Sequence, residues 1–151
     1  METLLCHIST TPAQTGLPAA IHPERFTGKS ESQLTHLAGL TQFGVNIVTL
    51  APGAWSALRH WHEGEDEFVY VLAGHLTLID DNGAHALTPG SFAGFPAGRA
   101  NAHHIANHSD APASFLVIGT RKQGVETIHY PDDFAKPRTI RRDVLGQRES
   151  G

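Results

Sequence analysis

Residues 60–67 read His-Trp-His-Glu-Gly-Glu-Asp-Glu, and this short stretch decides how the rest of the chain is interpreted. Residues two apart on a β-strand point to the same side of the sheet. His60 and His62 can therefore direct both imidazole rings at one ion, and Trp61 would lie on the opposite side. Glu67 opens an apolar run and would point inward at strand spacing, which adds a carboxylate to the two rings.

Glycines, prolines and a further histidine extend this stretch into two ordered motifs. Gly53 and Gly74 bound the first motif, and the second contains Gly90, Pro96, Gly98, His103 and Asn107. This double pattern resembles the two sequence motifs of the cupin superfamily, whose members are small β-barrels that bind one divalent metal ion. The resemblance implies four metal ligands, which are His60, His62, Glu67 and His103.

The fourth ligand has an alternative. Four residues separate Gly98 from His103, which is more than the family pattern has, so His104 is also a candidate. His103 keeps the three-residue gap to Asn107 that the family pattern shows, and strand alternation would turn His104 away from an ion. We therefore expect His103 to be the ligand, and we expect Asn107 to fix a turn or to bond to the backbone.

The resemblance runs from about residue 38 to residue 133 and points to a group of small, mostly uncharacterised bacterial single-domain cupins. It includes residues 40–46, the acidic run 63–67 and Tyr130-Pro131-Asp132. It implies an all-β fold, namely a single-domain cupin-type β-barrel of the kind also called a double-stranded β-helix or jelly roll. It implies no particular reaction.

The pattern of the chain from residue 43 onward is typical of an all-β sandwich or barrel, because short apolar segments alternate with turn signals. Asn82-Gly83 predicts a tight hairpin among them. Closing such strands into a barrel removes exposed edges and leaves a lumen that inward side chains fill or line. The expected strands cover residues 43–50, 56–62, 67–72, 75–79, 84–87, 91–95, 103–107 and 113–120.

Two arms flank the expected barrel, which would span residues 39–120. Residues 1–38 have little periodicity and predict an irregular N-terminal arm, with a short strand near residues 4–8. Residues 121–151 predict a charged C-terminal arm. Such arms often pack across a partner in cupins, so the resemblance implies a homodimer.

Composition limits the class of protein. At 151 residues, with 40% hydrophobic residues, 15 Gly and 9 Pro, the chain suits one domain with a core and many turns. A formal charge of −4 gives no electrostatic footprint for nucleic acid. No apolar run has the length of a membrane span. The single cysteine, Cys6, excludes an internal disulfide and fits a reducing compartment. The N-terminus has no basic region leading into an apolar stretch, so we expect a cytoplasmic protein.

The ligand set favours particular chemistry. Imidazole and carboxylate ligands suit one divalent ion such as Mn, Fe, Ni, Co or Zn. Positions left open on that ion could bind a chelating oxygen compound, polarise a carbonyl or activate water. We therefore expect a metal-dependent enzyme acting on a small oxygen-rich metabolite, of oxygenase, isomerase or lyase type. The alternative is a non-catalytic module that binds or senses a small ligand, and no catalytic residue can be named from the sequence.

The charged residues near the motifs have simpler interpretations. We expect Glu63, Glu65 and Asp66 to form a solvated acidic loop. Arg59 should point away from the ion by strand alternation. Arg99 could reach a carboxylate substrate, although a solvated loop residue is the simpler expectation.

Overall fold

The computed structural model describes residues 14–15, 21–143 and 145–149, and these build three antiparallel sheets. Cys6 and the strand expected near residues 4–8 lie outside the described residues. The largest sheet has the order β1-β2-β3-β10-β5-β8. Its strands are β1 (Gln14–Thr15), β2 (Lys29–Gln33), β3 (Phe43–Leu50), β10 (Ala113–Thr120), β5 (Glu67–Ala73) and β8 (Phe92–Phe95).

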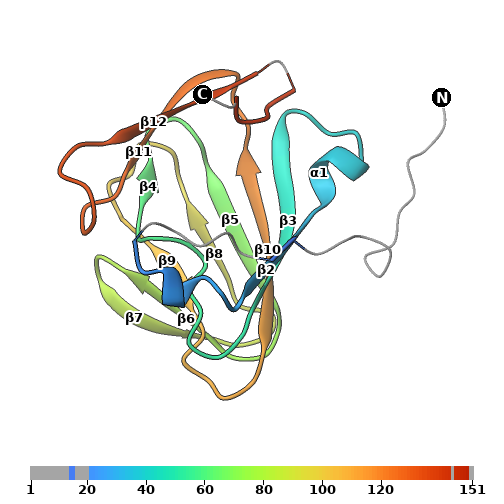
Figure 1. The fold of residues 1–151 in the computed structure, drawn as a ribbon, viewed down its shortest axis with the longest axis vertical. Coiled ribbons are helices and arrows are strands. Elements are labelled where there is room, and N and C mark those ends of the chain that lie inside the picture. The colour runs from blue at the N-terminus through green and yellow to red at the C-terminus, as the bar shows by residue number, and fades with distance from the viewer. Residues whose placement is uncertain (1–13, 16–20, 144, 150–151) are drawn as a thin grey trace.

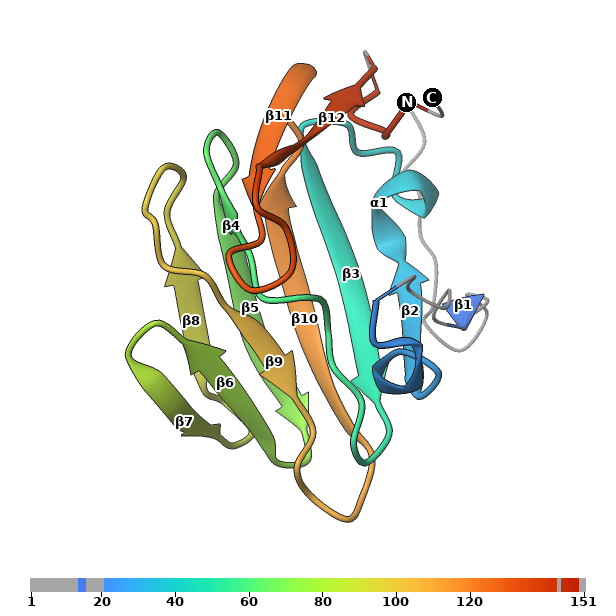
Figure 2. The ribbon, with the colours of Figure 1, turned by 60° about the vertical axis from the view of Figure 1, so that its left-hand side comes forward.

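Two three-stranded sheets face this large sheet and close the barrel (Figures 1 and 2). One has the order β7-β6-β9 and contains β7 (Gly83–Leu87), β6 (Leu76–Asp80) and β9 (His104–Ala106). The other has the order β12-β11-β4 and contains β12 (Arg138–Arg142), β11 (Gly124–His129) and β4 (Trp61–His62). Helical structure is limited among the described residues to a 3-10 turn at Pro23–Arg25 and to α1 (Leu34–Leu37). None of these helical segments is long and apolar enough to span a membrane.

The apolar core fills one part of the lumen. Val71, Phe115 and Val48 lie side by side across β5, β10 and β3, and each is at most 3% exposed. Leu76 and Leu78 of β6 pack against them from the opposite sheet. Further along the same strands, the inward positions become polar or carry no side chain, and this change creates the cavity described below.

The all-β prediction is confirmed, and the structure differs from it mainly between residues 56 and 62. Only Trp61–His62 forms a strand there, because the preceding chain bends away and touches its neighbour at isolated points. His60 pairs with His103 through two backbone hydrogen bonds of 2.9 and 3.1 Å. The hydroxyl of Ser56 accepts a hydrogen bond from the backbone of Ile105, which takes the place of a ladder bond.

Both arms are more regular than expected. Strand β2 of the N-terminal arm pairs with β3 at five consecutive positions, from Lys29–Leu50 to Gln33–Asn46. Strands β11 and β12 of the C-terminal arm pair with each other, and β11 also pairs with β4. These strands are polar and lack the apolar pattern from which strands are predicted. They are stabilised by pairing with adjacent strands rather than by an apolar face of their own.

Asn107 supports a turn, as its place in the second motif suggested. The residue is fully buried, and its amide nitrogen donates to the carbonyls of Leu50 and Ala111 at 2.8 Å. Its amide oxygen accepts hydrogen bonds from the backbone and the hydroxyl of Ser109. The side chain therefore ties the end of β3 to the loop that leads into β10.

Candidate metal centre

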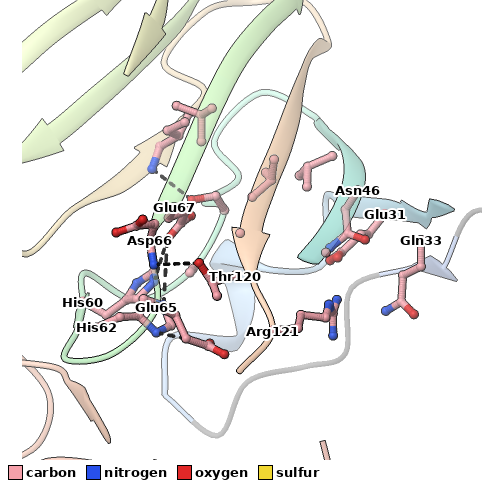
Figure 3. A pocket seen from close by; sticks show the side chains of 18 of the residues that line it. Glu31, Gln33, Asn46, His60, His62, Glu65, Asp66, Glu67, Thr120 and Arg121 are labelled. Carbon is pink, nitrogen blue, oxygen red and sulfur yellow. Dashed lines mark hydrogen bonds and ion pairs between the residues drawn. The ribbon is translucent and has the colours of Figure 1, made fainter. Parts of the chain in front are cut away.

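The four residues predicted as ligands lie together, and the Glu67 carboxylate is at their centre. Oε2 of Glu67 is 3.2 Å from Nε2 of His103, 3.6 Å from Nε2 of His60 and 3.8 Å from Nε2 of His62. Glu67 stands at the start of β5, and His62 stands in β4. Figure 3 shows His60, His62 and Glu67 grouped on one side of a cavity. These side chains are 4–19% exposed, so little water surrounds them.

Hydrogen bonds to the backbone fix the orientation of two of the three rings. Nδ1 of His60 is 2.7 Å from the carbonyl oxygen of Leu58, and Nδ1 of His103 is 3.2 Å from that of Asn101. A carbonyl can only accept, so Nδ1 carries a proton, and in the neutral ring the lone pair is on Nε2, the nitrogen that faces Glu67. Phe95 also stacks on the ring of His103, with centroids 3.4 Å apart. This arrangement of a metal-facing nitrogen and an anchored opposite nitrogen is usual for histidine ligands.

His104 has a different environment. Its Nδ1 is 2.9 Å from the carbonyl oxygen of Ala57, and its ring packs against Trp55 with centroids 4.8 Å apart. Among the described residues it makes no contact with Glu67 within hydrogen-bonding distance, whereas His103 does. The geometry therefore favours His103 over His104 as the fourth member of the group.

The third ring, His62, faces carboxylates that the sequence did not single out. Its Nδ1 lies 3.5 Å from Oε1 of Glu126 and 3.9 Å from Oε1 of Glu65. Both carboxylates are only 3% exposed, and Glu126 also accepts a hydrogen bond from the backbone of Gly64. These three residues form a second cluster with metal-ligating side chains. Burial raises the pKa of Glu126, since the charged form is poorly solvated there.

The prediction of a solvated acidic loop is wrong for Glu65. Its two oxygens accept hydrogen bonds of 2.7 and 2.9 Å from the guanidinium of Arg142, which is itself 7% exposed. The backbone of Lys122 donates a further bond to the same carboxylate. Glu63 and Asp66 are exposed, as expected. The buried pair joins the loop after β4 to β12, and no spacing rule in the sequence links positions 77 residues apart.

Arg59 lies beside the group and pairs with other acids. Its guanidinium contacts Asp81 and donates to both oxygens of Asp132 at 2.8 and 2.9 Å. The hydrogen bond to Asp132 raises the pKa of Arg59, because it favours the charged form. Arg59 therefore ties the β6–β7 turn and the loop after β11 to the segment that carries His60.

A cavity of about 580 Å³ opens from the four residues into the barrel. Its lining is mixed, with His104, Val69 and Phe115 on one part and Lys29, Glu31, Asn46 and Arg121 on another. Arg99 is absent from this lining and borders a much smaller space beside Trp61 and Phe95. The cavity is large enough for a small metabolite and is polar enough to bind its oxygen atoms.

The electrostatics of the group favour a neutral His62 and an ionised Glu67. Burial lowers the pKa of His62 to about 4, and the charge of His60 adds to this effect. Burial alone would raise the pKa of Glu67, but the interactions with the imidazoles of His103 and His60 outweigh it and hold that pKa well below its usual range. Neutral imidazoles and an ionised carboxylate are the protonation states that bind metal ions.

The shifted pKa of His62 predicts how the metal-free protein responds to acid. The unfolded chain takes up this proton near the ordinary histidine pKa of 6.5, whereas in the folded protein the pKa of His62 is about 4. The unfolded state binds more protons between these values, so the free energy of unfolding should fall as pH falls through that window, by on the order of 3 kcal/mol. Urea unfolding at several pH values measures it. His62→Gln should show a smaller slope, and identical slopes would contradict the assignment.

Comparison with known proteins agrees with this geometry. A family model described as the Cupin domain matches residues 46–119. No curated protein matches the chain. A crystal structure of a sugar phosphate isomerase of the cupin superfamily from Silicibacter pomeroyi is 41% identical, over 91% of this chain and 92% of its own, with a TM-score of 0.75.

Two further solved structures are similar over most of the chain. A protein from Acidithiobacillus ferrooxidans, proposed to be a sugar phosphate isomerase, is 27% identical over 97% of this chain and 90% of its own, with a TM-score of 0.76. The polyketide cyclase RemF from Streptomyces resistomycificus is 22% identical over 77% and 78%, with a TM-score of 0.61, a likeness of fold alone. The match to the family model and the relative at 41% identity establish that the chain belongs to the cupin superfamily.

Proposed function

We propose that the protein is a metal-dependent isomerase acting on a small, oxygen-rich carbonyl metabolite of the sugar phosphate class. The observation that carries this proposal is the convergence of three Nε2 atoms on one carboxylate oxygen at the wall of a polar cavity. The names of the solved relatives at 41% and 27% identity support the choice of isomerase among the reactions open to such a site. His60, His62, Glu67 and His103 would hold the ion.

The residues present fit a divalent ion. Ligands about 2.1 Å from one ion lie roughly 3.0–3.4 Å from each other at neighbouring positions. The three separations around Glu67 are 3.2, 3.6 and 3.8 Å, so a small inward movement of the rings would complete the site. Three imidazoles and one carboxylate suit Mn, Fe, Ni, Co or Zn. When bound, the ion would polarise a carbonyl oxygen and favour the substrate's chelating oxygens.

His104 offers the base that an isomerase needs. Isomerisation of a hydroxy carbonyl compound moves a proton from the hydroxyl-bearing carbon to the former carbonyl carbon, while the hydroxyl proton moves to the carbonyl oxygen. His104 lines the cavity, and its Nδ1 donates its proton to the carbonyl of Ala57. Nε2 therefore carries a lone pair that can accept the substrate proton and give it back. His104, which we do not assign as a metal ligand, is thus the candidate acid–base group.

The ligand assignment predicts different metal contents for neighbouring histidines. His60→Ala and His103→Ala should lose most of the bound metal, since each removes one of four ligands. His104→Gln should keep near-stoichiometric metal, because its ring makes no contact with Glu67. Plasma mass spectrometry of the purified proteins measures this, and circular dichroism checks that each variant is folded. Metal retained in His103→Ala and lost in His104→Gln would reverse the assignment.

The proposed reaction predicts turnover that depends on both the metal and His104. The metal-loaded protein should interconvert an aldose and a ketose phosphate from a panel of such compounds, and in heavy water it should exchange the proton beside the carbonyl. Proton NMR measures both. His104→Gln should slow turnover by about a hundredfold or more while keeping its metal. Binding of these compounds with neither turnover nor exchange would favour the alternative, a non-catalytic ligand-binding cupin.

We also propose a homodimer, which the family resemblance implied. The outer face of β5 and β8 supports it, because Tyr70 pairs with Phe92 there and the two are 37% and 68% exposed. Leu72 on the same face is 43% exposed. Light scattering should give twice the mass of the chain, and Phe92→Glu should shift the protein toward monomer with unchanged metal content. A monomeric mass for the unaltered protein would contradict the proposal.

A further inference from the structure

Three buried side-chain atoms have no hydrogen-bond partner among the described residues, and all three belong to residues that line the cavity. They are Oδ1 of Asn46, Nδ1 of His62 and Nε of Arg121. His62 belongs to the metal centre, whereas Asn46 and Arg121 lie on the other side of the cavity (Figure 3). Buried polar atoms without partners are rare, because each costs free energy when it leaves water. An acceptor and a donor are thus available on the wall opposite the metal centre.

The position of Arg121 depends on a glycine. Arg121 follows β10, and its guanidinium lies over Gly44 of β3. A Cβ atom at Gly44 would lie 2.9 Å from Nη2 and closer still to Nε, so any larger residue would displace the guanidinium. The loop after β12 covers the same side chain, and Nη1 makes a long bond of 3.4 Å to the carbonyl of Gly146. The guanidinium is therefore held against the cavity wall rather than extended into water.

The charge of Arg121 has no ion-pair partner among the described residues. Two other cations of the cavity have carboxylate partners, since Lys29 pairs with Glu31 at 3.5 Å and Arg142 pairs with Glu65. No carboxylate of the described residues lies within ion-pair distance of Arg121. Burial lowers the pKa of Arg121 and the nearby charge of Arg142 lowers it further, while the carboxylates of Glu65 and Glu31 oppose these two effects only in part. An anion at this position would relieve both effects.

The distance across the sheet suits a ligand that reaches both walls. Glu67 pairs with Gly119 on β10, and Gly119 pairs with Gly44 on β3. Two interstrand spacings, roughly 10 Å, therefore separate the backbones of Glu67 and Gly44. Gly119 between them has no side chain, which leaves the lumen open along this line. A short carbon chain can thus place oxygens at the metal centre and an anionic group at Arg121.

We propose that Arg121, seated on Gly44, binds the phosphate group of the substrate, at the end of the molecule opposite the metal centre. This assignment rests on the proposed function, and it adds the residue that orients the substrate. The guanidinium fork matches two phosphate oxygens better than a point charge does. Oδ1 of Asn46 on the same wall can accept a hydrogen bond from a substrate hydroxyl. Arg148, which also lines the cavity, adds positive charge beside this site.

The test uses metal-free protein and inorganic phosphate, so that it does not depend on catalysis. Titration should shift the Nε–Hε NMR signal of Arg121, which the Arg121→Met spectrum identifies by its loss. Arg121→Met and Gly44→Ala should each weaken phosphate binding about tenfold or more, because one removes the guanidinium and the other displaces it. The matched control is Arg141→Met, on an arginine side chain that is 60% exposed and paired with Glu149, and it should bind phosphate normally.

The outcomes separate this inference from the proposed function. Phosphate binding that is equal in the unaltered protein, Arg121→Met and Gly44→Ala would overturn the assignment, even if isomerase activity is found. An equal response to acetate would overturn the assignment to phosphate in favour of a carboxylate. Phosphate bound at Arg121 without any isomerase activity would uphold the subsite and remove the reaction. Nitrogen–proton correlation spectra of each variant check that a lost response does not come from unfolding.

Discussion

The backbone pairing of His60 with His103 is the constraint on which the rest of the site depends. Each residue donates its N–H to the carbonyl of the other, at 2.9 and 3.1 Å. Directly opposed residues of an antiparallel pair project their side chains to the same face. One closed ring of two hydrogen bonds therefore brings predicted ligands from two distant motifs to the same point. Glu67 arrives there from the large sheet, so the group connects the two layers of the barrel.

The local pattern of apolar and turn residues predicted much of the fold, and the spacing of the histidines pointed to the site. The strands 43–50 and 113–120 were predicted to the residue, because each is a short segment rich in apolar residues between turn signals. The grouping of His60 with His62 could be expected from their spacing, because residues two apart on a strand share a face, whereas the inclusion of His103 followed from the resemblance to the cupin motifs. The tight hairpin predicted at Asn82-Gly83 is present between β6 and β7. Only Gly83 has a positive φ, of 115°, whereas Asn82 does not.

The remaining features arise from contacts between distant residues, which no local pattern records. Glu65 looked like part of a solvated acidic run, and only the approach of Arg142 makes its burial tolerable. Glu126 and Arg121 stand among ordinary polar residues of the C-terminal arm, and their roles depend on which strands lie beside them. The sequence around Gly44 gives no sign of its role either, because that role is to leave space for the guanidinium of Arg121.

The link between Glu65 and Arg142 also bears on how the protein is made. Arg142 follows Glu65 by 77 residues in the chain. When the ribosome adds Arg142, all the strands of the large sheet have already been synthesised. Until then the Glu65 carboxylate lacks the partner that allows its burial, and the wall beside His62 cannot close. The nascent barrel would therefore have its core before it has a finished pocket. The proposed metal ion is thus expected to bind only after β12 has emerged from the ribosome.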